Sequence, residues 1–295
     1  MKADFKSGFV ALVGKPNVGK STLLNALVGT KVAITSPQPQ TTRRRVLGVV
    51  HRPGYQVVLV DTPGLSEARH ELGRRMVGTA QSESRDADLV LFLVDLTHPP
   101  TEADREAVSL LGKTKAPCLL VGNKLDRAKR PEEALEAYLQ LAPFEEAVSL
   151  SALTGKNLPR LLQTVVKRLQ PGPPFYPPEQ VSDQNQRLLI EEVIREKVLL
   201  NTRQEIPHAV AVQVEEMRPG AQPDTLYVAA NLYVEREGQK RIVIGKGGAL
   251  LKKIGQQARE ELQQLLGSKL FLELWVKVKE DWRERPDWLR SLGYE

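Results

Sequence analysis

The sequence has a single cysteine and no long apolar run. The one cysteine, Cys118, excludes an internal disulfide framework and is typical of proteins in a reducing compartment. The most apolar stretch, Leu89 to Val94, is far shorter than the roughly 18 residues of a transmembrane helix, so it predicts a buried strand. The first residues, MKADFKSG, lack the apolar segment of a secretion signal. These absences predict a cytoplasmic protein without a membrane-spanning segment.

The chain is longer than one ordinary domain. Its 295 residues, 41% of them hydrophobic and 26% charged, suggest about two globular domains. The net charge of +6 favours an anionic partner, and both nucleic acid and an anionic membrane qualify. Acidic and basic residues are equally numerous from residue 181 onward, so the bulk charge does not identify the part that binds this partner.

A proline-rich segment divides the sequence. Residues 171–178 read PGPPFYPP, with five prolines in eight positions, which excludes both a helix and a central strand. We therefore predict one domain over residues 1–170, a stiff linker over residues 171–182 and a second domain over residues 183–295.

The first domain is predicted to be a doubly wound, mostly parallel α/β sheet, because short apolar strands alternate with helical patterns. The predicted strands are Phe9–Val13, Val57–Val60, Leu89–Val94, Cys118–Val121 and Ala147–Leu150. The predicted helices are Ser21–Val28, Glu102–Leu111 and Leu158–Leu169. In such sheets ligands bind at the carboxyl ends of the strands.

The second domain is predicted to be a small α+β unit. Asp183 is a candidate N-cap for a helix that ends near Leu200. Strand patterns follow at His208–Glu216 and Thr225–Glu235, with turn residues between them. A short segment, a glycine-rich turn, a helix and a strand over Lys269–Lys279 complete the pattern.

The segment GKPNVGKS matches the phosphate-loop pattern G-x-x-x-x-G-K-[ST], and it lies between a predicted strand and a predicted helix. Backbone N–H groups and the helix N-terminus can hold phosphates there. Lys20 adds a positive charge, and the hydroxyl of Ser21 can coordinate Mg²⁺. The predicted phosphate-binding residues are Gly14, Lys15, Pro16, Asn17, Val18, Gly19, Lys20, Ser21 and Thr22.

The segment DTPG follows the strand Val57–Val60. Its carboxylate can hold Mg²⁺, and its glycine can bring an N–H close to the terminal phosphate. The motif alone is weak, but it stands about forty residues after a phosphate loop, where nucleotide-binding proteins of this kind carry it. We predict that this switch II segment contains Asp61, Thr62, Pro63 and Gly64.

The segment NKLD follows the strand Cys118–Val121 and indicates guanine. A carboxylate at that position accepts two hydrogen bonds from the ring N–H and amino group of guanine, and adenine lacks this donor pair. A second short segment, SAL, follows the next strand and can offer backbone N–H groups to the guanine carbonyl. The predicted guanine-binding residues are Asn123, Lys124, Asp126, Ser151, Ala152 and Leu153.

The order of these four motifs in residues 1 to about 170 resembles the Ras-like, translation-factor-related GTPase superfamily. The resemblance implies that QTTRR belongs to switch I, where Thr41 or Thr42 contacts Mg²⁺. We favour Thr42, which gives the Mg²⁺ ligands Ser21, Thr42 and Asp61, but the spacing leaves both threonines open.

Hydrolysis is expected to be slow without help. Ras-like members commonly carry a water-orienting glutamine after D-x-x-G, and this chain has Leu65 there. Asn17 resembles a residue of GTPases that bind K⁺ beside the phosphates. Two interpretations of Asn17 stay open, a K⁺ ligand or a residue that only stabilises the loop.

The segment IGKGG carries G-x-x-G between an apolar segment and an amphipathic helix. The order of elements around it resembles a type II KH domain, a module that holds about four single-stranded nucleotides. Five basic residues and no acid occur between positions 240 and 253. The predicted RNA-binding residues are Lys240, Arg241, Ile244, Gly245, Lys246, Gly247, Gly248, Lys252 and Lys253. In the tail, Trp282 and Trp288 either stack on bases or fix the tail to the domain.

A GTPase domain followed by a type II KH domain resembles the Era family of bacterial GTPases over essentially the whole chain. The resemblance implies GTP hydrolysis with Mg²⁺ and binding of 16S ribosomal RNA near its 3′ end during small-subunit assembly. It implies a monomer that does not bind DNA and that can associate weakly with the inner face of the cell membrane. We also predict that the nucleotide state controls RNA binding through the stiff linker. The alternative is a GTP-gated adaptor that docks protein or membrane partners.

Overall fold

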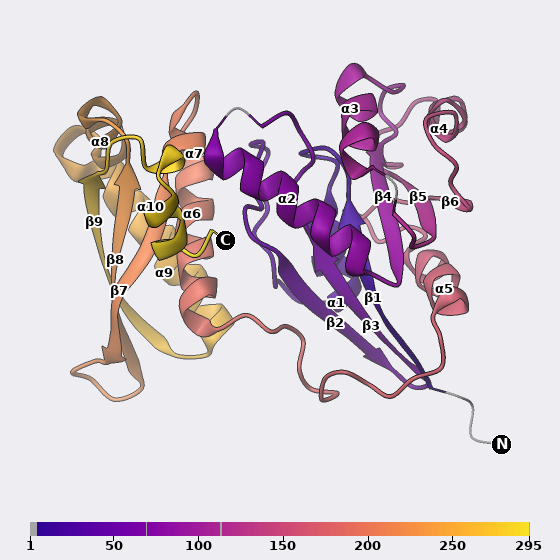
Figure 1. Ribbon diagram of the computed structural model, residues 1–295. Coiled ribbons are helices and arrows are strands. Elements are labelled where there is room, and N and C mark those ends of the chain that lie inside the picture. Colours follow the sequence, from indigo (N-terminus) through magenta and orange to yellow (C-terminus); the bar gives the residue numbers. More distant parts are fainter. Residues whose placement is uncertain (1–4, 69, 113, 295) are drawn as a thin grey trace. The chain divides into compact units, whose positions relative to one another are not determined.

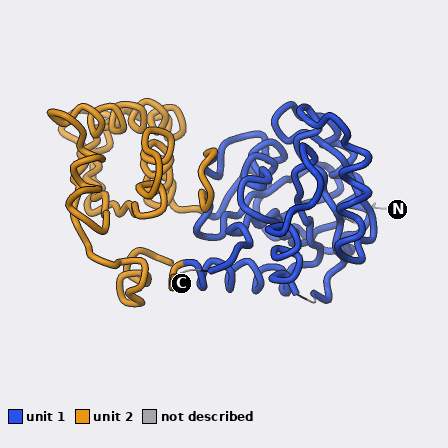
Figure 2. The backbone as a smooth tube through the Cα atoms, turned by 90° about the horizontal axis from the view of Figure 1, so that it is seen from above, with its two compact units in different colours: residues 1–35, 42–69, 73–183 blue, residues 36–41, 70–72, 184–295 orange. Residues whose placement is uncertain are grey.

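The computed structural model describes residues 5–68, 70–112 and 114–294. Their contacts divide into two compact units, coloured separately in Figure 2. The first unit takes residues 1–35, 42–69 and 73–183, and the second takes residues 36–41, 70–72 and 184–295. No helix among the described residues is long and apolar enough to cross a membrane.

The first unit contains a six-stranded sheet in the order β2-β3-β1-β4-β5-β6 (Figure 1). All neighbouring strands are parallel except β2 and β3, which form an antiparallel pair. The strands are β1 Lys6–Val13, β2 Val46–Arg52, β3 Tyr55–Asp61, β4 Leu89–Asp95, β5 Cys118–Asn123 and β6 Glu146–Ser149. The helices are α1 Lys20–Val28, α2 Glu71–Asp86, α3 Glu102–Leu111, α4 Pro131–Leu139 and α5 Leu158–Arg168.

Helices cover both faces of this sheet. On one face, α1 and α5 bury Leu24 and Leu161 against Leu12 of β1. On the other face, α2, α3 and α4 form a second core that contains Phe92 and Tyr138. The strands are apolar on both sides because both faces are covered. Because β1, β3, β4 and β5 are parallel, their carboxyl ends meet at one edge of the sheet, where the predicted nucleotide motifs begin.

The predicted proline-rich linker packs along the first unit. Gln56 of β3 is fully buried, and its Oε1 accepts hydrogen bonds from the backbone N–H groups of Phe175 at 2.7 Å and Tyr176 at 3.0 Å. Its Nε2 donates to the carbonyl oxygen of Tyr176 at 2.8 Å. Further along, the N–H of Val49 donates to the carbonyl oxygen of Val181 at 2.9 Å. These bonds hold the segment on β2 and β3, so it does not behave as an unattached spacer.

The second unit is a three-stranded sheet with helices on one face. Its sheet order is β7-β8-β9, with β7 antiparallel and β9 parallel to β8. The core lies between this sheet and helices α6, α8 and α9. The elements are α6 Gln186–Asn201, α7 Ile206–Ala209, β7 Ala211–Pro219, β8 Thr225–Val234, α8 Glu237–Ile244, η1 Lys246–Gly248, α9 Ala249–Leu266, β9 Lys269–Val278, η2 Trp282–Glu284 and α10 Pro286–Ser291.

Two predicted boundaries of the second unit are wrong. The N-cap of α6 is Asn185 and not Asp183, because the Asn185 side chain accepts a hydrogen bond from the N–H of Leu188 at 2.8 Å. The strand predicted from His208 begins at Ala211. His208 belongs to the short helix α7, in which Pro207 occupies one of the first positions that proline favours.

The C-terminal tail packs against the second unit. Trp282 is fully buried, and its Nε1 donates to the carbonyl oxygen of Ala209 at 2.9 Å. The ring of Trp288 meets the ring of Tyr233 edge-on at 5.4 Å. Both tryptophans therefore fix the tail to the domain, which supports the structural interpretation of these residues.

Candidate nucleotide site and RNA interface

Residues in left-handed conformations bend the phosphate loop between β1 and α1. The φ angles are 147° at Gly14, 64° at Asn17 and 99° at Gly19. Such a backbone turns successive N–H groups toward one point and forms a concavity for anions. A Cβ at Gly14 would lie 2.4 Å from the carbonyl oxygen of Leu93, so the position requires glycine. Helix α1 begins at Lys20, so its N-terminal N–H groups add positive potential to the loop.

Lys20 lies across this loop. Its Nζ donates to the carbonyl oxygens of Gly14 and Lys15, both at 3.2 Å. Burial lowers the pKa of Lys20 to about 8, and the negative charge of Asp61 opposes this shift. Lys15 instead forms an ion pair with Asp104, with 2.8 Å between Nζ and Oδ2. An anion bound in the loop would stabilise the buried charge of Lys20.

Three oxygen-bearing side chains meet at the carboxyl end of β3. Ser21 Oγ donates to Asp61 Oδ2 at 2.6 Å. Thr42 Oγ1 lies 2.8 Å from Ser21 Oγ and donates to Asp61 Oδ2 at 3.2 Å. Burial raises the pKa of Asp61, while the charge of Lys20 and these two hydroxyl hydrogen bonds act in the opposite direction.

The second carboxylate oxygen of Asp61 suits a metal ion. Asp61 is fully buried, and its Oδ1 has no hydrogen-bond partner in the part of the chain that the structure describes. A buried carboxylate oxygen without a partner, beside two hydroxyl oxygens, fits the hard oxygen ligands that Mg²⁺ takes. No group of three or more His, Cys, Asp or Glu side chains elsewhere among the described residues could hold a metal.

The two candidate threonines of switch I have different surroundings. Thr42 faces the oxygen cluster just described. The hydroxyl of Thr41 donates to the carbonyl oxygen of Gln38 at 2.7 Å and lies 2.7 Å from Ser36 Oγ. The carbonyl oxygen of Thr41 accepts a hydrogen bond from the guanidinium of Arg195, which is 1% exposed. Thr41 is thus held by its own loop and by α6, and only Thr42 lies beside Ser21 and Asp61.

Switch II starts close to the phosphate loop. A Cβ at Gly64 would lie 2.8 Å from the backbone nitrogen of Pro16, so only glycine allows this approach. The hydroxyl of Thr62 donates to the carbonyl oxygen of Leu12 at 2.8 Å. The N–H of Leu65 donates to the carbonyl oxygen of Gly14 at 3.0 Å, while its side chain is 1% exposed and belongs to the second core of the sheet. The residue after DTPG therefore serves packing and cannot orient water.

Asn123 joins three loops at the end of β5. It is 3% exposed, its Nδ2 donates to the carbonyl oxygen of Val18 at 2.8 Å, and its Oδ1 accepts from the N–H of Ala152 at 2.9 Å. A Cβ at Gly19 would lie 2.3 Å from Asn123 Nδ2, so the phosphate loop approaches this side chain closely. The NKLD motif, the SAL segment and the phosphate loop are thus tied into one site.

The carboxylate predicted to select guanine, Asp126, lies at the surface of this site. Asp126 Oδ1 accepts a hydrogen bond from Ser151 Oγ at 2.5 Å, and Ser151 Oγ in turn accepts from the N–H of Thr154 at 3.2 Å. This contact orients the carboxylate toward the SAL loop. Leu153 is 69% exposed, so its side chain does not contribute to the packed part of the site.

Sequence analysis did not identify Asp95 as part of the site. Asp95 ends β4 and lies beside Asn123 in the parallel pairing of β4 and β5. Its Oδ2 accepts a hydrogen bond from Lys124 Nζ at 2.6 Å, which orients the lysine stem. Burial alone would raise the pKa of Asp95, but the bonds from Lys124 and Thr97 lower it. The sequence did hold a signal for Asp95, which is an acidic residue directly at the carboxyl end of a buried strand. Neighbouring parallel strands end at the same edge of a sheet, so such a residue is expected near the end of β5.

The G-x-x-G loop of the second unit joins α8 to α9. Glycines at positions 245, 247 and 248 have φ angles of 74°, 59° and 80°, which side-chain-bearing residues rarely adopt. The N-cap of the 18-residue helix α9 is Gly248, so the helix N-terminus adds positive potential beside the loop. Lys246 at the tip is exposed. The loop therefore allows a sugar–phosphate backbone to approach closely.

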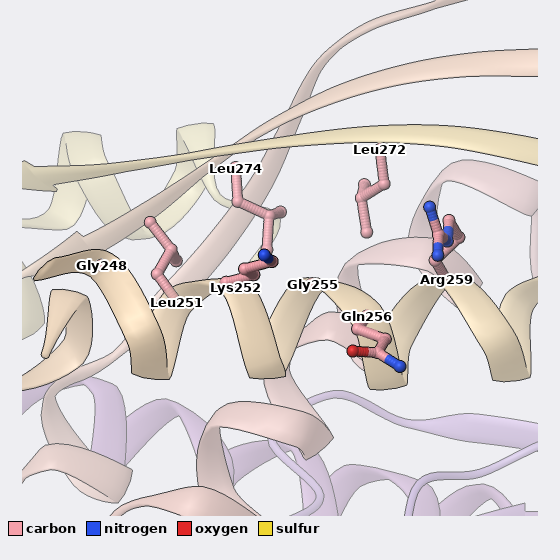
Figure 3. Close-up of a pocket in the computed structure, with 8 residues that line it drawn as sticks. All are labelled: Gly248, Leu251, Lys252, Gly255, Gln256, Arg259, Leu272 and Leu274. Atoms are coloured by element: carbon pink, nitrogen blue, oxygen red, sulfur yellow. The ribbon is translucent and has the colours of Figure 1, made fainter.

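A groove with a cavity of 420 Å³ runs beside this loop, between α9 and β9 (Figure 3). Leu272 and Leu274 point from β9 toward α9 and form its apolar wall (Figure 3). The residues that line it are Gly248, Leu251, Lys252, Gly255, Gln256, Arg259, Leu272 and Leu274.

Only part of the predicted RNA set lines this groove. Gly248 and Lys252 do, whereas the other predicted residues lie on the loop and its flanks. Arg259 was missed, although it stands seven positions after Lys252 and so lies on the same face of the helix. Val243 and Ile254, which flank the loop, are fully buried in the core and do not line the groove.

Comparison with known proteins identifies both units. Residues 9–124 match a family model described as a 50S ribosome-binding GTPase, and residues 205–283 match a KH domain model. The chain is 46% identical to GTPase Era of Heliobacterium modesticaldum over 292 residues, which covers 98% of this chain and 97% of that protein. It is also 46% identical to GTPase Era of Geobacter metallireducens, with 98% of each chain covered.

The chain belongs to the Era family of GTPases.

Two solved structures of this family match the whole chain. A variant of Era from Aquifex aeolicus bound to GDP and AlF4⁻ superposes with a TM-score of 0.94 at 43% identity, covering 98% of this chain and 99% of that one. Era in complex with MgGDPNP and nucleotides 1506–1542 of 16S ribosomal RNA superposes with a TM-score of 0.95 at 43% identity and the same coverage. The fold expected from the sequence, a GTPase domain followed by a KH domain, is confirmed.

Proposed function

We propose that this protein binds and hydrolyses GTP and binds single-stranded RNA from the 3′ region of 16S ribosomal RNA during small-subunit assembly. One observation carries the proposal. A single chain combines a guanine-nucleotide site closed by Asn123 with a KH groove beside a G-x-x-G loop. A family member bound to MgGDPNP and nucleotides 1506–1542 of that RNA gives the nucleotide and RNA classes. We further propose that the protein acts in the cytoplasm.

We propose that the phosphates and the guanine base of the nucleotide bind at opposite ends of the site. The inward N–H groups of residues 14–21 and the charge of Lys20 hold the phosphates. Asp126 accepts two hydrogen bonds from the guanine edge, and the Lys124 stem covers one face of the base. Ser21, Thr42 and Asp61 would hold Mg²⁺. The bound ion would supply positive charge that offsets the negative charge developing during phosphoryl transfer.

Hydrolysis must proceed without a glutamine after DTPG. Since the side chain of Leu65 is in the core, the water is oriented by backbone groups near Gly64, by a cation or by a partner. Asn17 is a candidate K⁺ ligand, and we expect GTP turnover in K⁺ to exceed turnover in Na⁺ at equal ionic strength. Equal turnover in the two salts would leave Asn17 only a loop-stabilising role. Its left-handed φ of 64° fits that role, because asparagine adopts this conformation more readily than most residues.

Nucleotide state is proposed to control RNA binding through switch I. Thr42 faces the oxygens of Ser21 and Asp61, while the adjacent residue Thr41 is held by Arg195 of α6, which packs against the KH sheet. A rearrangement of Thr42 around the terminal phosphate therefore moves a peptide that α6 also holds. RNA affinity that is equal with GDP and with a GTP analogue would contradict this control.

The decisive experiment is RNA crosslinking and sequencing in cells and with purified protein. Wild type and a Gly247→Asp variant would be compared in the presence of a GTP analogue and of GDP. Aspartate in the loop places negative charge against the RNA backbone, so crosslinks should be lost. Crosslinks to the 3′ region of 16S ribosomal RNA that depend on Gly247 support the proposal. A wild-type protein that crosslinks no RNA would favour an adaptor that docks protein.

A further inference from the structure

The outer face of β9 carries exposed aromatic residues. Its alternate residues point inward to the core and the groove, from Leu270 to Val276. The intervening residues read Lys269, Phe271, Glu273, Trp275 and Lys277. Phe271 is 54% exposed and Trp275 is 61% exposed. Side chains of this size are normally buried, so this face of the strand requires an explanation beyond folding.

Among the residues that the structure describes, the C-terminal tail covers one end of this sheet face. In the tail, the ring of Trp288 packs on Tyr233 of β8. The carbonyl oxygen of Ser291 accepts a hydrogen bond from Gln213 Nε2 of β7 at 3.2 Å. Phe271 and Trp275 keep their exposure although the tail lies on the same face.

Two rings on the uncovered part, those of Phe271 and Tyr227, are held by their neighbours. Phe271 and Tyr227, which are paired across β8 and β9, stack at 5.8 Å with an interplanar angle of 13°. The Tyr227 hydroxyl donates to Glu273 at 2.9 Å, and the guanidinium of Arg218 lies 4.0 Å from the centre of the Tyr227 ring. Side chains fixed in this way present flat surfaces at a small further loss of entropy on binding.

The chemistry of this face favours nucleic acid over a protein partner. Along β9, exposed lysines at positions 269 and 277 flank Phe271 and Trp275. Aromatic rings between basic residues are the arrangement that binds single-stranded nucleic acid, since any base can stack and the phosphates need positive charge. A protein interface instead has an apolar core from which charged residues are depleted, whereas charged side chains alternate with the aromatic residues on this face of β9.

Continuity with the groove identifies the RNA. Strand β9 is an edge strand, so only its free edge separates the inner residues Leu272 and Leu274, which line the groove, from the outer residues Phe271 and Trp275. A KH groove holds about four nucleotides, and the RNA proposed above is longer. We propose that RNA extending from the groove passes over the edge of β9 and stacks its bases on Phe271 and Trp275. This inference rests on the proposed function.

The test compares short and long RNA on the full-length protein with a GTP analogue. The probes are an oligoribonucleotide of about five nucleotides that fills the groove and one of about twelve that extends beyond it. Trp275→Ala should weaken binding of the long RNA about tenfold and leave the short RNA unchanged, because one stacked base is lost. Trp275→Phe should restore most of the affinity. Leu200→Ala is the matched control, since Leu200 is 50% exposed on α6.

Each outcome decides between the site and its alternatives. If Trp275→Ala binds both RNAs as wild type does while Gly247→Asp binds neither, the outer surface is overturned and the groove stands. If Gly247→Asp also binds both RNAs as wild type does, the proposed RNA function fails. If Trp275→Ala loses a ribosomal protein from the purified complex without losing RNA affinity, the surface binds protein and the inference is wrong.

Discussion

Replacing Asn123 by alanine should separate the loops of the nucleotide site. The side chain is 3% exposed and makes two hydrogen bonds, to Val18 and to Ala152, at 2.8 and 2.9 Å. Both partners are buried backbone groups, with Val18 0% and Ala152 4% exposed. Asn123→Ala leaves a carbonyl oxygen and an N–H without these partners and removes a side chain that joins the two loops.

The expected magnitude follows from these two groups. Leaving a buried polar group unsatisfied costs about 1–3 kcal/mol, and water that enters the space left by the amide recovers part of this. We expect the free energy of unfolding of the first unit to fall by about 2–4 kcal/mol. For a unit of this size, that corresponds to a decrease in melting temperature of roughly 5–15 °C. GDP affinity should fall at least about tenfold, because the two loops must then be ordered by the ligand.

The assay is thermal and urea unfolding without nucleotide, followed by titration with a fluorescent GDP. Asn185→Ala is the control, because it removes one exposed cap bond from α6 and should cost about 1 kcal/mol without changing GDP affinity. If Asn123→Ala unfolded within about 0.5 kcal/mol of wild type, the two hydrogen bonds would not hold the loops. Unchanged GDP affinity would separately refute the role of Asn123 in assembling the site.

Three further substitutions test other parts of the molecule. Gln56→Leu removes the bonds to Phe175 and Tyr176, so protease cleavage between residues 171 and 182 should become at least about tenfold faster; unchanged cleavage would mean that other contacts hold the segment. Gly255→Leu should fill the groove, because a Cβ at this position already lies 3.4 Å from Leu274 Cδ1. RNA affinity should fall at least about tenfold while GDP affinity stays the same. Unchanged RNA affinity would exclude the groove as the binding site. Leu65→Gln should not accelerate GTP hydrolysis and should destabilise the first unit by about 1–3 kcal/mol, because it buries an amide in the core; faster turnover would show that this side chain can reach the water.

The first unit was predictable from sequence because its strands are apolar on both faces and its motifs have fixed spacing. Strand β2 and helices α2 and α4 were not predicted. Strand β2 is apolar over most of its length, but it follows the polar switch I segment and pairs antiparallel with β3, which the alternation of strands and helices does not indicate. Helix α2 carries few apolar residues, and its burial depends on the sheet it covers.

The motifs alone predicted most groups of the candidate nucleotide site, since the residue types of each motif indicate the ligand group they bind. Asp95 was missed because its role depends on the register between β4 and β5, which places it beside Asn123 and next to Lys124. The groove was predicted at the G-x-x-G loop, but its wall was not. Leu272 and Leu274 come from a strand twenty residues away, and local patterning cannot show which side of a strand faces a particular helix.

The choice between Thr41 and Thr42 can be settled by a matched pair of alanine variants. The two residues are adjacent, carry the same side chain and are each 9% exposed, so their substitution removes the same atoms from equally buried positions. Only Thr42 lies beside Ser21 and Asp61, whereas the Thr41 hydroxyl bonds to Gln38.

Thr42→Ala should therefore reduce the gain in GTP-analogue affinity that Mg²⁺ provides, by about tenfold, because an oxygen on a charged centre contributes about 1.5–3 kcal/mol. Thr41→Ala should retain this gain. The measurement is analogue affinity with Mg²⁺ and with EDTA for both variants, and GDP affinity in EDTA checks that the remainder of the site is intact. If Thr41→Ala lost the Mg²⁺ gain and Thr42→Ala kept it, the cluster of Ser21, Thr42 and Asp61 would not be the metal site.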